Sequence, residues 1–417
     1  MVSMHFFASY GTLAHIMNST LSFLRSFFPL NTHDHIVIVG GTVRDFLQNK
    51  DNQDIDLVTD LGDTQLKALG FRSVETRSTP PIYVMHHHSF GKIEIVRLES
   101  LTDLEKDLRR RDFTLNALAM GLTGECIDPL GGRKDIETGT LRTCGRHSFV
   151  NDPLRIFRAF RFAANGFHLS GETRMLIQDQ DWDTAFRTIP PERFSQEIIR
   201  ALTAQKPEQF FEHLVRFNVG THILPELFRM RDIPAGPLEY HPEGDLLTHS
   251  IQVLQRTAAQ TDDPLARFCA FFHDLGKLAT DIGHYPKHHR HEEAGFAIAE
   301  KFCDRLCLPA RYRTALSWTS RLHGKAGKWN ELRDTTKVKM AWQALQAGIT
   351  EILPLISAAD KPGNLPISGW NHAVRVAGMN TKELGINHEH LQTIPEKDRS
   401  SLILQKKAEA LRVLLSK

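Results

Sequence analysis

Residues 36–58 constrain the fold of this chain more than any other segment. Residues 36–39 are Ile-Val-Ile-Val, a short apolar run that predicts a buried strand. Gly40 and Gly41 follow, and residues 42–47 predict a helix. Asp54 and Asp56 then alternate with apolar residues, which predicts a second strand. This succession of strand, double glycine, helix and strand predicts an α/β domain at the start of the chain.

The double glycine and the two aspartates suit the binding of a phosphate chain and a metal ion. Glycines let backbone N–H groups approach an anion closely, and Arg44 lies in the first turn of the predicted helix. Residues two apart in a strand point to the same face, so Asp54 and Asp56 are predicted to lie side by side. Mg²⁺ typically binds through one or two carboxylates together with substrate phosphates. A plain tight turn and a solvated strand face are the alternative interpretations.

A third predicted strand, residues 92–97, carries Glu94 between apolar neighbours. Its carboxylate is placed to approach the two aspartates, although carboxylates are also common on edge strands. The preceding run of His86, His87 and His88 predicts an exposed hairpin tip rather than a metal site.

Residues 40–45 (Gly-Gly-Thr-Val-Arg-Asp) and 54–56 (Asp-Ile-Asp) resemble motif A of the class II tRNA nucleotidyltransferases, within the polymerase-beta-like superfamily. Later segments resemble four further motifs of that family in the same order: residues 110–117, 128–132, 152–162 and 191–197. The resemblance implies template-independent transfer of C and A nucleotides from CTP and ATP to the 3′ end of a tRNA. It also implies a requirement for Mg²⁺ and the release of pyrophosphate.

The resemblance implies a role for each matching residue. Asp54 and Asp56 are expected to be the catalytic residues that hold Mg²⁺. The other expected positions are Gly41 and Arg44 at the triphosphate, Arg111 and Asp112 at the ribose, Asp152 and Arg155 at the base, and Arg158 and Arg161 beside the nucleotide and its phosphates.

Residues 152–162 predict a helix with Asp152 as its N-cap and Pro153 as its first residue. Arg155, Arg158 and Arg161 recur every three residues and therefore fan over part of one side of this helix. An Arg fork and an Asp carboxylate can match the edge of a base, but the same spacing also suits a solvated arginine face.

Two features depart from the family pattern. Asn151 stands where the family usually has Glu, which removes a charge next to the expected base-reading pair. The span from Asp56 to Arg111 is short for relatives that add the terminal A through a flexible loop. Addition of CC only, or of A only, is therefore kept beside full CCA addition.

Histidine and aspartate residues of the second half of the chain suit a divalent metal ion. His249 lies on a predicted helix, His273 and Asp274 follow an apolar run, and Asp360 ends another apolar helix. Imidazole and carboxylate groups bind divalent ions at hydrolytic sites, although a single histidine is usually a packing residue. The set resembles the HD phosphohydrolase superfamily, which implies a bound divalent metal of unknown identity.

Some members of the nucleotidyltransferase family carry such a domain in this position. There it is a metal-dependent phosphatase and 2′,3′-cyclic phosphodiesterase, which implies repair of damaged RNA ends. Four other histidines are expected either to bind substrate phosphate or a second ion, or to form a polar loop: His288, His289, His291 and His323.

Together these interpretations predict an α+β chain. A polymerase-beta-like head on a small mixed sheet is expected over residues 1–145 and a helical neck and body over 146–235. A helical HD domain is expected over 236–417. The expected partners are tRNA, ATP and CTP. A poly(A) polymerase relative and an RNA-binding protein with a degenerate site are the alternatives.

Charge, cysteines and the first residues limit these possibilities. The 417 residues carry a net charge of +2, so a surface for nucleic acid must be local. The five cysteines include no C-x-x-C pair, which favours reduced thiols in a cytoplasm. Residues 13–28 predict an amphipathic helix packed on the first domain rather than a signal peptide. No membrane segment is predicted.

Overall fold

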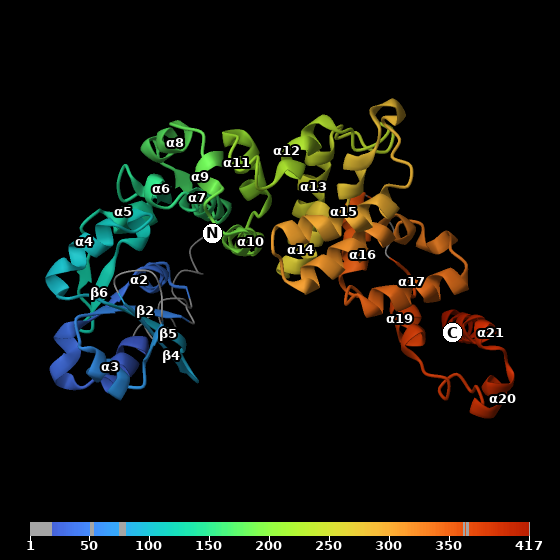
Figure 1. Ribbon diagram of the computed structural model, residues 1–417, viewed down its shortest axis with the longest axis horizontal. Helices are drawn as coiled ribbons and strands as arrows, with labels where there is room; N and C mark the ends of the chain where they lie inside the picture. The colour runs from blue at the N-terminus through green and yellow to red at the C-terminus, as the bar shows by residue number, and fades with distance from the viewer. Residues whose placement is uncertain (1–18, 51–53, 75–80, 362, 364–366, 417) are drawn as a thin grey trace, which may run out of the picture. The chain divides into compact units, whose positions relative to one another are not determined.

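The computed structural model describes residues 19–50, 54–74, 81–361, 363 and 367–416. The chain separates into two compact units, Met1–Gln180 and Asp181–Lys417 (Figure 1). The first unit is mixed α/β and the second is helical, which confirms the predicted α+β class. The finer division at residues 145 and 235 stays a prediction.

The first unit is built on a seven-stranded sheet with the order β3-β4-β5-β2-β1-β6-β7. The pairing of β2 with β5 is parallel and the other pairings described in this sheet are antiparallel, so the sheet is mixed as predicted. The strands are β1 (Ile36–Val39), β2 (Ile55–Thr59), β3 (Arg72–Val74), β4 (Ile82–His87), β5 (Gly91–Arg97), β6 (Ala119–Gly121) and β7 (Cys126–Ile127).

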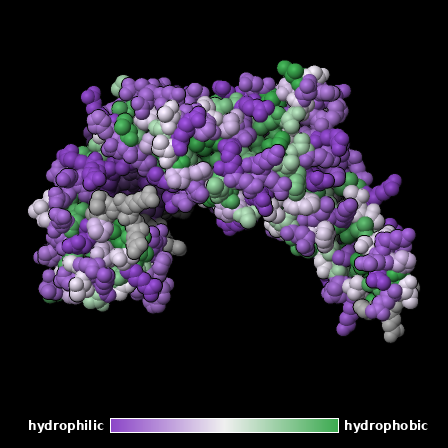
Figure 2. All heavy atoms as spheres, viewed as in Figure 1, coloured by the Kyte–Doolittle hydropathy of each residue, from purple (hydrophilic) through white to green (hydrophobic). Residues whose placement is uncertain are grey.

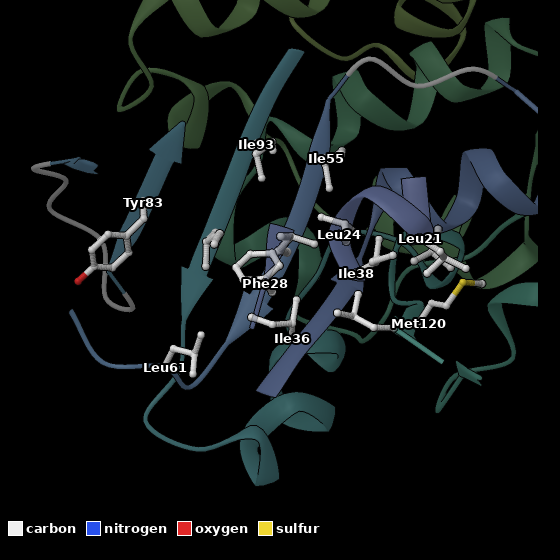
Figure 3. Close-up of a cluster of buried hydrophobic side chains, with 14 of the residues drawn as sticks. Leu21, Leu24, Phe28, Ile36, Ile38, Ile55, Leu61, Tyr83, Ile93 and Met120 are labelled. Carbon is white, nitrogen blue, oxygen red and sulfur yellow. The ribbon is translucent and has the colours of Figure 1, made fainter. Parts of the chain in front are cut away.

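Both faces of the sheet are covered, which explains the continuous apolar run of β1. Side chains alternate between the faces of a strand, so Ile36 and Ile38 join one buried cluster and Val37 and Val39 join another. Ile55 belongs to the same cluster as Ile36 (Figure 3). Burial on both sides fixes the register of this central strand.

The amino-terminal helix covers one face of the sheet. Residues 19–27 are helical, and Leu21, Leu24 and Phe28 are buried in the cluster with Ile38 (Figure 3). This contact confirms the predicted packing for the part of the segment that the structure describes. Residues 13–18 of the predicted helix lie outside the described residues.

Short helices surround the sheet, and a small parallel pair of strands lies beside them. Besides the amino-terminal helix, the α-helices of this unit are α2 (Gly41–Leu47), α3 (Asp63–Ala68), α4 (Leu104–Arg109), α5 (Gly132–Glu137), α6 (Ser148–Asn151), α7 (Arg155–Ala164) and α8 (Gly171–Gln178), and the strands of the small pair are β8 (Thr140–Leu141) and β9 (His168–Leu169). Between β4 and β5 the chain turns, and His86 and His88 are exposed, as predicted for a hairpin tip.

The second unit is helical in its described residues. Its α-helices are α9 (Asp183–Phe186), α10 (Pro191–Leu202), α11 (Glu208–Phe217), α12 (Pro225–Arg229), α13 (Leu246–Ala258), α14 (Pro264–Phe272), α15 (His291–Arg305), α16 (Ala310–Ala326), α17 (Asp334–Gln346), α18 (Ile352–Asp360), α19 (Trp370–Gly378), α20 (His388–Thr393) and α21 (Glu396–Leu415). The 3₁₀-helix η5 (Leu275–Ala279) directly follows the His-Asp pair.

Aromatic packing holds the centre of the second unit together. Phe211 of α11 stacks on Phe271 of α14 with ring centroids 4.0 Å apart. Phe268 and Phe272, on the same helix as Phe271, pack against Phe302 of α15. Each such ring buries a large apolar area, so α14 is rigidly held immediately before His273.

Most of the visible surface of each unit is hydrophilic, with small hydrophobic patches between polar side chains (Figure 2). None of the helices within the described residues combines the length and the apolar composition that crossing a bilayer needs.

Candidate functional site

The first site, here called the head site, forms where β1 turns into α2. Gly40 has φ +67°, a conformation that other residues rarely adopt. A Cβ atom on Gly40 would lie 2.6 Å from Nη1 of Arg111 and 3.7 Å from Oδ2 of Asp56. A Cβ atom on Gly41 would lie 3.6 Å from Nη2 of Arg44 and 3.9 Å from Oδ2 of Asp56. The bend therefore brings the double glycine, two arginines and one aspartate together.

A hydroxyl group ties the start of α2 to the start of β2. Oγ1 of Thr42 donates to the carbonyl of Asp54 at 3.2 Å and accepts from the N–H of Asp56 at 3.0 Å. Ile55 and Leu57 of β2 belong to one buried cluster, and Asp56 lies on the opposite face of the strand. The predicted alternation is confirmed for residues 55–57, whereas Asp54 is exposed and precedes β2, so its position beside Asp56 stays a prediction.

Glu94 of β5 lies directly beside Asp56 in the parallel pairing. Burial, the neighbouring charge of Glu94 and that of Asp54 raise the pKa of Asp56, while Arg111 and Lys92 oppose the rise. Nζ of Lys92 donates to Oε2 of Glu94 at 2.5 Å. Three carboxylates thus lie near one another at the central strands β2 and β5, partly balanced by two cations, which is a charge arrangement that a divalent ion would stabilise.

Two hydrogen bonds and an ion pair join the arginine of α2 to the arginine-rich helix α7. Nη1 of Arg44 donates to Oδ1 of Asn116 at 2.6 Å, and Nδ2 of Asn116 donates to Oδ1 of Asp112 at 2.9 Å. Oδ2 of Asp112 pairs with Nη2 of Arg158 at 2.7 Å. Burial alone would raise the pKa of Asp112, but Arg158, Asn116 and the Phe113 N–H lower it below its usual value. Asp112 is 5% exposed, and its contact with a ribose stays a prediction.

Helix α7 begins two residues later than predicted. It starts at Arg155 rather than Pro153, because Oδ1 of Asp152 accepts from the N–H of Leu154 and holds residues 152–154 in a turn. Arg155 donates to the backbone carbonyls of Arg110 and Arg111 at 2.9 and 3.2 Å. Asp152 thus begins this turn, and Arg155 follows it as the first residue of α7.

On α7 the arginines share the helix with buried apolar residues. Ile156, Phe157 and Phe160 are completely buried. The guanidinium of Arg161 lies 4.9 Å from the ring centroid of Phe162. The helix therefore packs on one side and presents its arginines from the other, as the three-residue spacing predicted.

The second site, here called the histidine site, consists of His249, His273, Asp274 and Asp360. His249 lies on α13, His273 and Asp274 follow α14, and Asp360 is the last residue of α18. Three helices that are separate in sequence thus deliver the four side chains that the sequence predicted as metal ligands.

The four side chains converge closely. Nε2 of His249 is 3.1 Å from Oδ1 of Asp360 and 3.6 Å from Oδ2 of Asp274. Nε2 of His273 is 3.3 Å from Oδ2 of Asp274 and 3.5 Å from Oδ1 of Asp360. Both Nε2 atoms are buried and, within the described residues, make no hydrogen bond. Buried nitrogen and oxygen atoms that converge in this way, with both imidazole nitrogens left without hydrogen bonds, fit the ligands of a divalent ion.

Two further histidines face the same aspartate. Nε2 of His323 is 3.2 Å and Nε2 of His291 is 3.4 Å from Oδ1 of Asp274. His288 instead bonds to Thr280 and to the carbonyl of Pro234, and His289 is exposed. The structure therefore brings two of the four additional histidines into the histidine site.

Among the described residues, three groups place ligand atoms within 4.8 Å of one another, and all are in the second unit. They are His249, His273, Asp274 and Asp360; Asp274, His291 and His323; and His241, Glu243 and His249. The carboxylates of the head site do not form such a group. Their spacing would leave part of a coordination shell to substrate phosphates, as is usual for Mg²⁺.

The charges of the histidine site shift the pKa values of its histidine and aspartate side chains in opposite directions. Burial alone would lower the pKa of His273, but the adjacent carboxylates of Asp274 and Asp360 raise it to about 10. Burial alone would raise the pKa of Asp274, but Lys277 and His273 hold it well below its usual value. His273 would therefore have to lose its proton before it binds a metal ion.

A cavity of about 340 Å³ opens onto the histidine site. Asp274, His291 and His323 line it together with three lysines, Lys277, Lys328 and Lys361. Lys277 is nearly buried, and its Nζ lies 2.7 Å from Oδ2 of Asp274. Cations around such a cavity favour a phosphate group.

Two functional candidates were not predicted from the sequence. Glu243, in a turn before α13, accepts from Nδ1 of His249 at 2.6 Å and from Nδ1 of His241 at 3.0 Å. Burial alone would raise the pKa of Glu243, but the hydrogen bonds from both histidines lower it to about 2. Lys277 is the other candidate. Only the proximity of each residue to the predicted ligands in sequence could have indicated them.

Three family models match separate parts of the chain. The Poly A polymerase head domain matches residues 36–142, and the HD domain matches residues 246–361. The probable RNA and SrmB-binding site of polymerase A matches residues 166–230. Fold and sites thus define a nucleotidyltransferase head joined to an HD domain, two kinds of domain that depend on metal ions.

Curated relatives narrow this class to one family. A multifunctional CCA protein of Legionella pneumophila is 35% identical over 328 residues, which are 74% of this chain and 79% of the relative. A multifunctional CCA protein of Thioalkalivibrio sulfidiphilus is 36% identical over 320 residues, with coverages of 72% and 78%. The chain belongs to the family of multifunctional CCA proteins.

Solved structures share the fold at lower sequence identity. A CCA-adding enzyme in complex with CTP is 20% identical, with a TM-score of 0.62 over 94% of this chain and 91% of that chain. The Thermotoga maritima CCA-adding enzyme in complex with tRNA is 21% identical, with a TM-score of 0.60 over 96% and 95%.

Proposed function

We propose that this protein adds C and A nucleotides to the 3′ end of tRNA from CTP and ATP, without a template, and releases pyrophosphate. The observation that carries the proposal is the convergence of the double glycine, Asp56, Arg44 and Arg111 at one bend. The names of the curated relatives, and the CTP and tRNA bound by the structural relatives, support it.

In this proposal Asp54 and Asp56 hold Mg²⁺. When bound, the ion lowers the pKa of the attacking hydroxyl and neutralises charge on the phosphates. Glu94 adds negative charge beside Asp56, while Lys92 pairs with Glu94 and limits the repulsion. We expect the ribose hydroxyl of the tRNA end to attack the α-phosphorus as the bond to pyrophosphate breaks.

The basic residues of the head site hold the nucleotide. At Gly41 the absence of a side chain lets the triphosphate approach the backbone, and Arg44 and Arg111 supply positive charge on either side. Arg111 and Asp112 are the proposed ribose contacts.

We propose that Asp152 and Arg155 select the base of the incoming nucleotide. Arg155 is anchored by three backbone carbonyls and by the hydroxyl of Ser148, so its remaining donors keep a fixed direction, and we expect them to meet a base edge. Arg158 and Arg161 serve the nucleotide and its phosphates. Asn151, in place of the usual Glu, leaves this pair without an adjacent charge.

For the histidine site we propose a metal-dependent phosphohydrolase that acts on phosphomonoesters and 2′,3′-cyclic phosphates. His249, His273, Asp274 and Asp360 are the proposed ligands of a divalent ion that is not identified. When bound, such an ion activates a water molecule for attack on phosphorus. The lysine-lined cavity supports a phosphate-containing substrate. Both activities are proposed for a cytoplasmic enzyme.

The decisive test is a product analysis. The protein is incubated with tRNA that lacks its 3′ end, with labelled CTP alone, ATP alone and both, and the products are sequenced. We expect two C residues followed by one A. Addition of only C residues, or of only A, would assign one of the two narrower activities.

Two other results would overturn the proposal. Long A tails on arbitrary RNA would assign a poly(A) polymerase, which shares the head domain. No incorporation of either nucleotide, with tRNA binding intact, would assign an RNA-binding protein with a degenerate head site.

The histidine site needs a separate test. The substitution His273→Ala is expected to abolish hydrolysis of 2′,3′-cyclic AMP and to leave nucleotide addition unchanged, because it removes one proposed ligand in the second unit. Unchanged hydrolysis in this variant would contradict the assignment of the metal site.

A further inference from the structure

The four histidines that face Asp274 are all held through Nδ1, but not by the same kind of group. His273, His291 and His323 each bond through Nδ1 to the backbone carbonyl three residues earlier, at 2.7–2.9 Å. His249 bonds through Nδ1 to a side chain, the carboxylate of Glu243, at 2.6 Å.

The ring of His249 has a different kind of acceptor, although its backbone is helical like that of His323. His249 lies inside α13, where backbone carbonyls accept the N–H groups of the helix itself. Its own N–H donates to the carbonyl of Asp245 at 3.1 Å. A carbonyl within a helix can accept from a ring nitrogen, as that of Ser320 does from His323 in α16, but Nδ1 of His249 bonds to the carboxylate of Glu243, which lies just before α13.

Glu243 is held firmly in place to do this. Its side chain is 9% exposed and also accepts from His241 at 3.0 Å. Gly244, with φ +90°, turns the chain, and its carbonyl accepts from the N–H of Ala235 at 2.8 Å. Asp245 then caps α13 by accepting from the N–H of Thr248. The acceptor is thus preorganised by the turn.

We propose that Glu243 is a positioning residue of the histidine site, whose carboxylate keeps Nδ1 of His249 protonated and so directs the Nε2 lone pair toward the metal ion. The inference rests on the proposed metal site. A carboxylate behind a ligating imidazole fixes its tautomer and orientation and makes it a stronger ligand. Oε1 of Glu243 also accepts from His241, which lines the cavity.

The alternative is that His241, Glu243 and His249 bind an ion of their own, since their ligand atoms are also close together. The distances favour hydrogen bonds. A metal ion lies about 2.0–2.2 Å from each nitrogen or oxygen ligand, and 2.6 Å between Nδ1 and Oε1 is the length of a charge-assisted hydrogen bond.

The test is a titration of the full-length protein with Co²⁺ alone, followed by its visible absorption. The band that His273→Ala removes reports the histidine site. Glu243→Ala is expected to weaken Co²⁺ binding roughly tenfold to a hundredfold. Glu243→Gln is expected to weaken it less, because an amide oxygen still accepts from Nδ1 while the charge is lost. The control is Glu239→Gln, an exposed residue of the same segment, which is expected to bind Co²⁺ as the unchanged protein does.

A second measurement separates positioning from a purely structural role. Long-range nitrogen–proton NMR correlations of the imidazole rings report their tautomers in the metal-free protein. We expect one tautomer of His249, with the proton on Nδ1, in the unchanged protein and in Glu243→Gln. A mixture of tautomers is expected in Glu243→Ala. Nucleotide addition is expected to stay unchanged in all three variants of this segment.

The outcomes distinguish this inference from the proposed function. If the unchanged protein gives no absorption that depends on His273, the metal site itself is wrong. If that absorption exists and Glu243→Ala binds Co²⁺ equally tightly, only the positioning role is refuted. Loss of a separate second ion in Glu243→Ala would also overturn it. If Glu243→Ala does not fold, the Co²⁺ affinity of Glu243→Gln is the test. An affinity equal to that of the unchanged protein would then refute the positioning role.

Discussion

The substitution Gly276→Ala tests how the histidine site depends on one close contact between backbones. Gly276 lies in η5, two residues after Asp274, and packs against the first turns of α15. A Cβ atom there would lie 1.9 Å from the carbonyl oxygen of His291 and 2.7 Å from the nitrogen of Gly295. Both atoms belong to the backbone of α15, so no side chain can turn away to relieve the overlap.

The distances set the size of the effect. Ordinary contact begins at 3.4 Å, so η5 and α15 must separate by about 1.5 Å, the difference between 3.4 and 1.9 Å. Overpacking a close-packed region costs about 1–3 kcal/mol, and we expect the upper end because the backbone must move. At roughly 2–4 °C per kcal/mol for a unit of this size, the melting temperature should fall by about 6–12 °C. The shift of α15 should also move His291 away from Asp274 and weaken phosphohydrolase activity.

Differential scanning calorimetry and hydrolysis of 2′,3′-cyclic AMP measure these effects. The matched control is Gly378→Ala at the end of α19, where a Cβ atom would lie 3.6 Å from Cδ2 of Leu345, an ordinary contact. Because Ala is favoured over Gly in helices by up to about 1 kcal/mol, this variant should be neutral or slightly stabilised. A melting temperature and a hydrolysis rate for Gly276→Ala equal to those of the control would refute the reasoning.

Further changes test both sites. Asp56→Asn is expected to lower the rate of nucleotide addition by roughly a hundredfold or more in a radiolabel assay, since metal ions supply several kcal/mol of charge stabilisation. The control Asp60→Asn, which removes an ion pair with His35, should retain the full rate in the same assay. Asp112→Asn should destabilise the first unit by about 2 kcal/mol in urea unfolding, less than the loss of a fully buried pair because the side chain of Arg158 is 35% exposed. Because the pKa of Asp112 is lowered, the stabilisation of the folded unit by the Asp112–Arg158 pair is present above about pH 4 and is lost as the pH falls further. A destabilisation by Asp112→Asn that is equally large at pH 3 would contradict this. Metal binding at the histidine site should strengthen as pH rises, because His273, with a pKa of about 10 in the metal-free protein, must lose its proton; calorimetric affinities that do not change with pH would contradict this.

Local patterns in the sequence determined much of the head site. The apolar run of β1, the double glycine and the alternation around Asp56 each act within a few residues, where backbone geometry leaves little choice. Helix α7 shows the limit of such reasoning. The spacing of its arginines predicts the side of the helix that they occupy, but the sequence predicts a start two residues too early, because the side chain of Asp152 forms a turn before the helix.

In the second unit the sequence indicated the ligands but not what supports them. His249, His273, Asp274 and Asp360 stand in an order that predicts a metal site, and the structure brings them together. The bond from His249 to Glu243 had no signal in the spacing, because it depends on how the turn before α13 folds back over the helix.

The remaining features were decided by tertiary packing alone. The ion pair of Asp112 with Arg158 and the contact of Gly276 with the backbone of α15 form only because segments distant in sequence pack against each other. Residue types and short-range periodicity determine which element forms and which face it buries. The partner of a buried charge, or the room available for a methyl group, depends on the relative placement of whole elements, which close packing sets and no local pattern encodes.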